Sequence, residues 1–201
     1  MAEFDWQRFY QFTKDSLPHP LVLRAVALLG LPGHPRQALD LGVGAGRDTR
    51  YLLAQGFHVT AVDQDPQAVA LLARLAQPAL RVVQAPFEDF AFATYDLINA
   101  QFALPFLPER HFRSVFERVK GALQPRGIFA GQFFGIHDQW NTPDHDHTMT
   151  FLTREAAEER LLGLEVLEIV EEDVDGHVAD GSPKHWHAFH ILARKQLDIN
   201  P

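Results

Sequence analysis

Apolar residues follow two different spacings along the chain. Some segments place them at helical spacing, which predicts amphipathic helices, and shorter apolar or β-branched runs predict strands. The expected helices lie at about 3–14, 20–30, 47–55, 66–76, 109–123 and 154–162. The expected strands lie at about 37–42, 57–63, 80–85, 95–102, 127–135, 165–172 and 186–194.

The order of these segments predicts the sheet. Strands that alternate with helices pair in parallel through right-handed crossovers, so helices should cover both faces. The last two strands are joined only by VDGHVADGSPK, without a helix, which predicts an antiparallel hairpin. One strand of the sheet should therefore run in reverse, whereas a nicotinamide-binding fold usually ends in a helix-linked parallel strand.

Composition restricts the class of protein. The 201 residues include 18 basic and 26 acidic side chains, a formal charge of −8, and no cysteine. A net acidic chain without a basic cluster is not expected to bind nucleic acid, and the absence of cysteine fits a reducing cytoplasm. The most apolar segment, LVLRAVALLGL, is short and contains Arg24, so no membrane span and no membrane partner are expected.

The stretch LDLGVGAGRD, residues 39–48, ends the first strand with an acid and three spaced glycines. Gly42, Gly44 and Gly46 suit a tight turn that a ligand approaches closely. The nicotinamide fingerprint needs a small residue where Arg47 stands. Asp40 would attract a cation and repel a pyrophosphate, so it favours S-adenosylmethionine and its ammonium group.

Acids also follow the next two strands. Asp63 ends the second strand, where its carboxylate can accept hydrogen bonds from both ribose hydroxyls, and Gln64 follows it in the expected cofactor site. After the third strand, Glu88 or Asp89 can bind the adenine amino group and Phe87 can cover the adenine face.

On these residues the sequence resembles the class I S-adenosylmethionine-dependent methyltransferases over about residues 36–195, and more loosely their small bacterial tellurite-resistance-type members. The resemblance implies a doubly wound, mostly parallel seven-stranded α/β sheet of order 3-2-1-4-5-7-6 with strand 7 antiparallel. It places Asn99, Ala100 and Gln101 beside the methionine moiety. NAQF stands where DNA and RNA amino-methylases carry Asn/Asp-Pro-Pro-aromatic, so a nucleobase amino group is not the expected acceptor.

We therefore expect one domain, residues 1–201, with a helical cap or lid at 1–34 and a Rossmann-like core at 35–195. The expected activity is methyl transfer from S-adenosylmethionine to a small molecule. A nicotinamide oxidoreductase and a non-catalytic S-adenosylmethionine-binding protein are the alternatives. The pattern does not indicate an oligomeric state.

Catalytic residues are harder to identify. Methyl transfer relies on positioning, and it needs a base only when the acceptor keeps its proton. Tyr10 and His137 are the candidates, with His145 and His147 as alternatives to the latter. The aromatic residues near Tyr10 can either pack the first helix or line an acceptor pocket, and packing is favoured for Phe12.

The eleven histidines raise the question of a metal. His185 and His187 share one face of the last strand, but no third ligand follows at a recognisable spacing, so no metal is expected.

Overall fold

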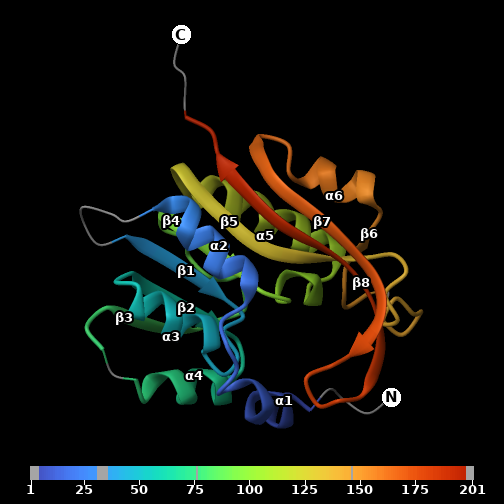
Figure 1. The fold of residues 1–201 in the computed structure, drawn as a ribbon, viewed down its shortest axis with the longest axis horizontal. Coiled ribbons are helices and arrows are strands. Elements are labelled where there is room, and N and C mark those ends of the chain that lie inside the picture. Colours follow the sequence, from blue (N-terminus) through green and yellow to red (C-terminus); the bar gives the residue numbers. More distant parts are fainter. Residues whose placement is uncertain (1–4, 31–35, 76, 146, 198–201) are drawn as a thin grey trace.

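The structure, a computed structural model, describes residues 5–30, 36–75, 77–145 and 147–197. One twisted sheet runs through the molecule with helices on both sides (Figure 1). Its strands are β1 (Gln37–Leu41), β2 (His58–Asp63), β3 (Leu80–Gln84), β4 (Tyr95–Ala100), β5 (Leu123–Gly135), β6 (Phe151–Leu152), β7 (Leu164–His177) and β8 (Pro183–Lys195). The helices are α1 (Trp6–Thr13), α2 (Pro20–Leu29), α3 (Arg47–Ala54), α4 (Pro66–Ala73), α5 (Glu109–Ala122) and α6 (Arg154–Arg160), with a 3-10 turn η1 (Leu104–Phe106).

The strand order is β3-β2-β1-β4-β5-β8-β7, and the short β6 pairs with the end of β5. The strands from β3 to β5 pair in parallel, whereas β8 is antiparallel to both of its neighbours. The expected order and the single reversed strand are thus confirmed. The labels differ from the expected 3-2-1-4-5-7-6 only because the two-residue β6 takes a number.

Side-chain alternation divides the core between the two faces of the sheet. Leu39 and Leu41 of β1 pack in the cluster that contains the apolar face of α5. Ala38 packs instead with α2 and with Leu52 of α3. Asp40 has the parity of Ala38, so its carboxylate points toward α3. None of the described helices is long and apolar enough to span a membrane.

The terminal hairpin is longer than expected. Its strands were expected at about 165–172 and 186–194, but the β7–β8 ladder continues through Gly176↔Lys184 to His177↔Pro183. Only residues 178–182 form the turn. The glycines and acids of VDGHVADGSPK indicate a loop by their composition, yet an edge strand tolerates polar side chains on both faces. The added length carries the hairpin tip toward α1 (Figure 1).

Candidate functional site

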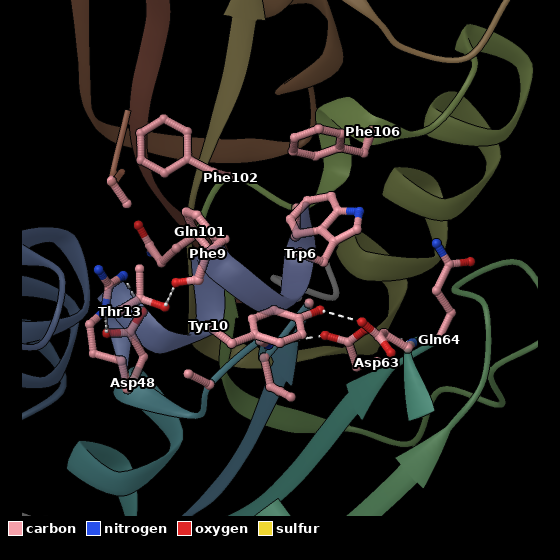
Figure 2. Close-up of a pocket in the computed structure, with 18 of the residues that line it drawn as sticks. Trp6, Phe9, Tyr10, Thr13, Asp48, Asp63, Gln64, Gln101, Phe102 and Phe106 are labelled. Atoms are coloured by element: carbon pink, nitrogen blue, oxygen red, sulfur yellow. Dashed lines mark hydrogen bonds and ion pairs between the residues drawn. The ribbon is translucent and has the colours of Figure 1, made fainter. Parts of the chain in front are cut away.

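A cavity of about 770 Å³ lies beyond the carboxyl ends of β1 and β2, with α1 on one side of it (Figure 2). Its volume is within the range of about 300–1,000 Å³ found for small-molecule sites. One end is polar and is formed by the turn after β1 and the ends of the neighbouring strands. The other end is aromatic and is formed by α1, residues 102–107, the end of β5, Trp140 and the hairpin tip.

The glycine turn has the left-handed backbone that its composition predicts. Gly42, Gly44 and Gly46 have φ values of 71°, 50° and 77°. A Cβ atom at Gly42 would lie 2.5 Å from the Cβ atom of Ala103, and one at Gly44 would lie 3.3 Å from the Tyr10 ring. Gly42 and Gly44 line the cavity, whereas Gly46 precedes α3 outside it, facing Leu72.

Asp40 lines the cavity, but both of its oxygens already have partners. Thr49 Oγ1 donates at 2.5 Å and Asn99 Nδ2 donates at 2.8 Å. Burial, and next the nearby Asp48 carboxylate, raise the pKa of Asp40 to about 7. The Thr49 and Asn99 hydrogen bonds oppose this shift. Asp40 therefore supports the inner end of the site. Asn99 does not line the cavity, and it contributes by holding Asp40 in place.

Asp63 lies at the end of β2 and holds the glycine turn in place. Its carboxylate accepts hydrogen bonds from the Gly44 N–H at 3.0 Å and from the Asp65 N–H at 2.9 Å. Burial raises the pKa of Asp63, and these two backbone donors oppose the rise. Gln64 lines the cavity beside it.

The loop after β3 contributes Phe87 and Glu88 to the cavity, while Asp89 is not among its lining residues. Two residues that the sequence analysis missed hold this loop. His111 Nδ1 lies 2.6 Å from Glu88 Oε1, and Arg118 donates to the carbonyl oxygen of Glu88 at 2.7 Å. Both come from α5, and nothing in their local sequence shows that they reach this loop.

After β4, Gln101 lines the cavity and Ala100 is fully buried. A chain of amides fixes Gln101. Its Nε2 donates to Asn99 Oδ1 at 2.7 Å, and Gln132 Nε2 donates to its Oε1 at 2.7 Å. Gln132 also accepts the Phe102 N–H at 2.8 Å, where φ is 50°. Gln132 was missed because it lies on β5, far from any motif.

Asp48 also lines the cavity and was missed. It follows the glycine turn and accepts the His19 N–H at 2.8 Å, which joins α3 to the start of α2. Arg47 donates to both of its oxygens at 3.0 Å. The Arg47 guanidinium, which stands where a nicotinamide fingerprint needs a small residue, is therefore paired with Asp48.

The first catalytic candidate, Tyr10, lines the cavity. Its hydroxyl donates to Asp65 Oδ2 at 2.9 Å, and burial, followed by the Asp63 charge, raises the Tyr10 pKa. The phenol is therefore protonated at neutral pH, which suits hydrogen bonding more than proton abstraction. Phe12, for which packing was expected, is 49% exposed, whereas Trp6 and Phe9 line the cavity.

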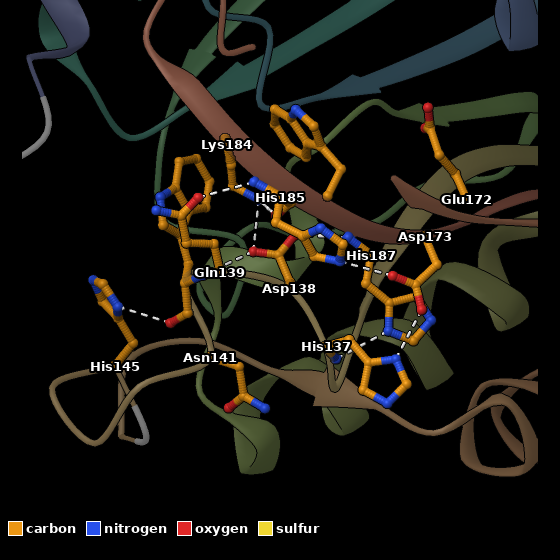
Figure 3. A network of polar contacts seen from close by, with 12 residues as sticks. His137, Asp138, Gln139, Asn141, His145, Glu172, Asp173, Lys184, His185 and His187 are labelled. Carbon is orange, nitrogen blue, oxygen red and sulfur yellow. Dashed lines mark hydrogen bonds and ion pairs between the residues drawn. The ribbon is translucent and has the colours of Figure 1, made fainter. Parts of the chain in front are cut away.

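The second candidate, His137, does not line the cavity. His137 Nδ1 lies 2.8 Å from Asp173 Oδ2, and its ring stacks on His187 with centroids 4.7 Å apart (Figure 3). Asp173 and His187 have opposite parity to the cavity-lining Glu172 and Trp186, so they occupy the other face of the hairpin. His145 and His147 are not lining residues either.

His137, Asp173 and His187 could together hold a metal ion. The spacing rule missed this group because its members come from three different segments. In the structure, however, both nitrogens of His187 have partners. Nδ1 accepts the His137 N–H at 3.0 Å, and Nε2 lies 3.0 Å from Glu171 Oε1. The cluster is thus satisfied by its own hydrogen bonds.

Residues 38–127 match the family model described as "Methyltransferase domain". The chain is 33% identical over 114 residues to an uncharacterized methyltransferase of Synechocystis, covering 56% of this chain and 51% of that protein. It is 37% identical over 84 residues to ribosomal RNA small subunit methyltransferase A of Synechococcus, covering 40% and 30%. The matches thus span about half or less of these relatives.

The fold has a similar counterpart among solved structures. TehB from Haemophilus influenzae superposes with a TM-score of 0.75 at 20% identity, covering 94% of this chain and 66% of that chain. An identity this low supports a shared fold alone. The match to the methyltransferase domain is a separate one, and it covers residues 38–127, which include the glycine turn. The chain thus matches a methyltransferase domain over residues 38–127 and shares its fold with TehB over most of its length.

Proposed function

We propose that this protein transfers a methyl group from S-adenosylmethionine to a small-molecule acceptor. The supporting observation is that one cavity joins the glycine turn and Asp63 to a separate aromatic end. A methyl transfer requires two ligands side by side with the methyl carbon between them, and a two-ended cavity meets that requirement.

The polar end suits S-adenosylmethionine. The two lining glycines let the turn pack closely against Ala103 and Tyr10, where side chains would collide. Asp63 retains lone pairs for ribose hydroxyls beside its two backbone donors. Phe87 provides an apolar surface for the adenine ring and Gln101 a polar group near the centre. The bound cofactor would supply an electrophilic methyl group on a positive sulfur, and these residues orient it.

The acceptor is a small molecule in this proposal, although several relatives are named as rRNA methyltransferases. Nucleic-acid binding relies on clustered Lys and Arg, whereas this chain has a formal charge of −8. Among the described lining residues Arg47 is the only Lys or Arg, and it is paired with Asp48. The acidic cavity would repel a phosphate backbone.

We also propose that residues 1–16 and 136–150 close over the acceptor as a lid, within the division into a cap at 1–34 and a core at 35–195. Residues 1–4, 31–35 and 146 lie outside the described residues. In support, the Trp6 ring lies 5.3 Å from the Phe106 ring, and Trp140 lies 5.9 Å from Phe106. Exclusion of water from the sulfonium would aid the transfer.

Hydrogen exchange tests the lid. Cofactor plus acceptor should protect both segments, and protection confined to 40–65 and 86–101 would contradict the lid.

Calorimetric titration with S-adenosylhomocysteine and with NAD tests the cofactor. We expect one site per chain for S-adenosylhomocysteine, with a Kd of about 1 µM to 1 mM, the range in which enzyme KM values commonly lie, and no heat with NAD. Binding of NAD without binding of S-adenosylhomocysteine would instead support the oxidoreductase. Because a non-catalytic binding protein would pass this test, methyl transfer itself must be measured with radiolabelled S-adenosylmethionine.

A further inference from the structure

The aromatic end of the cavity is built from segments far apart in sequence. Trp6 comes from α1, Phe102 and Phe106 follow β4, and Trp186 lies on β8. Figure 2 shows Trp6, Phe102 and Phe106 gathered around one space. The rings pack on one another at tilted or edge-to-face angles, with 5.5 Å between Phe102 and Trp186. Such rings offer flat apolar surfaces that favour a planar ligand.

A buried lysine lies against the rings of the aromatic end. Lys184 Nζ lies 3.7 Å from the Trp186 ring centroid and 4.3 Å from that of Trp140. The Lys184 and Asp138 side chains are 2% and 0% exposed, and Nζ donates to the Asp138 oxygens at 2.5 and 2.6 Å (Figure 3). The ring faces of Trp186 and Trp140 that turn toward Lys184 are therefore already occupied by a cation, and are not free to bind a cationic acceptor.

The charge at the aromatic end disfavours an anionic acceptor. Glu172 lines the cavity from β7, with its Oε2 atom 2.8 Å from His190 Nε2. The lining also contains Asp40, Asp48, Asp63, Asp65 and Glu88. Arg47, the one Lys or Arg among the described lining residues, donates to Asp48. An oxyanion or carboxylate at the aromatic end would therefore meet the Glu172 carboxylate, and the nearby cations Lys184 and Arg47 are already paired with Asp138 and Asp48.

We propose that the acceptor is an uncharged, planar aromatic or heteroaromatic molecule. This inference rests on the proposed methyl transfer and adds the chemical class of its acceptor. The lone pair of an acceptor oxygen or nitrogen forms the bond to the methyl carbon. The carbon–sulfur bond breaks with its electron pair remaining on sulfur, and the proton of the acceptor O–H or N–H leaves to solvent.

Three ligands with the same ring and different charge test the class. The protein is first saturated with S-adenosylhomocysteine, and its binding is measured separately, because failure at that step counts against the proposed function and not against the acceptor class. Then 2-naphthalenemethanol, 2-naphthoate and 2-naphthylmethylammonium are titrated by calorimetry. We expect the neutral ligand to bind about tenfold more tightly than either ion. Equal or tighter binding of an ion, or no binding of the neutral ligand, would overturn the inference.

Variants locate the binding. Trp6→Ala and Phe106→Ala should each weaken the neutral ligand about tenfold and leave S-adenosylhomocysteine within about twofold. Phe12→Ala is the matched control, because Phe12 lies on α1 but is 49% exposed and does not line the cavity.

Glu172→Gln should strengthen 2-naphthoate about fivefold without changing the neutral ligand. Full binding of the neutral ligand in folded Trp6→Ala and Phe106→Ala, or an unchanged charge preference in Glu172→Gln, would place the acceptor elsewhere and overturn the inference.

Discussion

The two ends of the cavity are stabilised in different ways. At the polar end, a few adjacent residues determine the geometry: the Gly44 N–H donates to Asp63, and Asp63 in turn accepts the Asp65 N–H. At the aromatic end, rings from α1, β5, β8 and the loops between them meet only because the whole chain has folded. The polar end is thus a local motif, and the aromatic end depends on long-range packing.

The comparison predicts that damage to the Lys184–Asp138 pair affects the aromatic end selectively. Lys184→Met leaves a buried carboxylate without its cation, so the free energy of unfolding should fall by about 3–5 kcal/mol. Urea unfolding measures this loss. Lys14→Met, at a lysine whose side chain is 59% exposed, should change stability by less than about 0.5 kcal/mol. If folded Lys184→Met binds 2-naphthalenemethanol as tightly as the wild type does, the Lys184–Asp138 pair does not hold the rings of the aromatic end in place.

Asp63→Ala should damage the polar end and leave the aromatic end intact. Removal of this carboxylate should weaken S-adenosylhomocysteine by about 2–4 kcal/mol, because charge-assisted ribose hydrogen bonds and the support of the glycine turn are lost together. Calorimetry checks this, with Asp175→Ala, at an exposed hairpin acid, as the control. Unchanged affinity in a folded Asp63→Ala protein would show that the ribose assignment is wrong.

Gly44→Ala separates backbone strain from steric contact. A Cβ atom in the left-handed region costs about 1–2 kcal/mol at either Gly44 or Gly56. At Gly56 the added atom meets nothing within 4 Å, whereas at Gly44 it meets the Tyr10 ring at 3.3 Å. Both variants should lose stability through backbone strain, Gly44→Ala the more because of the ring contact, but only Gly44→Ala should lose cofactor affinity. Equal affinity in the two variants would remove Gly44 from the ligand site.

Asp40 predicts a pH effect at the inner edge of the polar end. Its pKa is raised to about 7, so the folded protein binds a proton between about pH 4 and 7 that the unfolded chain has already lost. Stability should therefore fall as pH rises through this interval, by at most about 1.4 kcal/mol per pH unit from this group. In Asp40→Asn this part of the slope should be absent. Parallel stability curves for the two proteins would contradict the raised pKa.

The same contrast explains what could be predicted from sequence. The reversed strand followed from the order of the predicted elements, and the strand order from the family resemblance. Eight of the twelve expected cofactor residues line the cavity, namely Asp40, Gly42, Gly44, Asp63, Gln64, Phe87, Glu88 and Gln101. These residues follow strand ends, so their place in the sequence predicts their place in space. Gly46, Asp89, Asn99 and Ala100 lie nearby without lining the cavity.

The aromatic end could not be predicted in this way. His177 reaches the cavity because the hairpin is longer than its composition indicates, and Lys184 lies within the stretch expected to be a loop. His137 fell on the other face because the segment after β5 turns back on the hairpin. No local spacing encodes such meetings, since each depends on two segments far apart in sequence.

Simultaneous occupancy tests the central claim, that one cavity holds cofactor and acceptor at separate ends. The Kd of 2-naphthalenemethanol is measured by calorimetry without and with saturating S-adenosylhomocysteine. The account predicts one molecule of each ligand per chain, with the Kd of the neutral ligand unchanged or lowered by the cofactor product. A Kd that rises in proportion to the S-adenosylhomocysteine concentration would mean that the two ligands compete for one place, which would contradict a two-ended site.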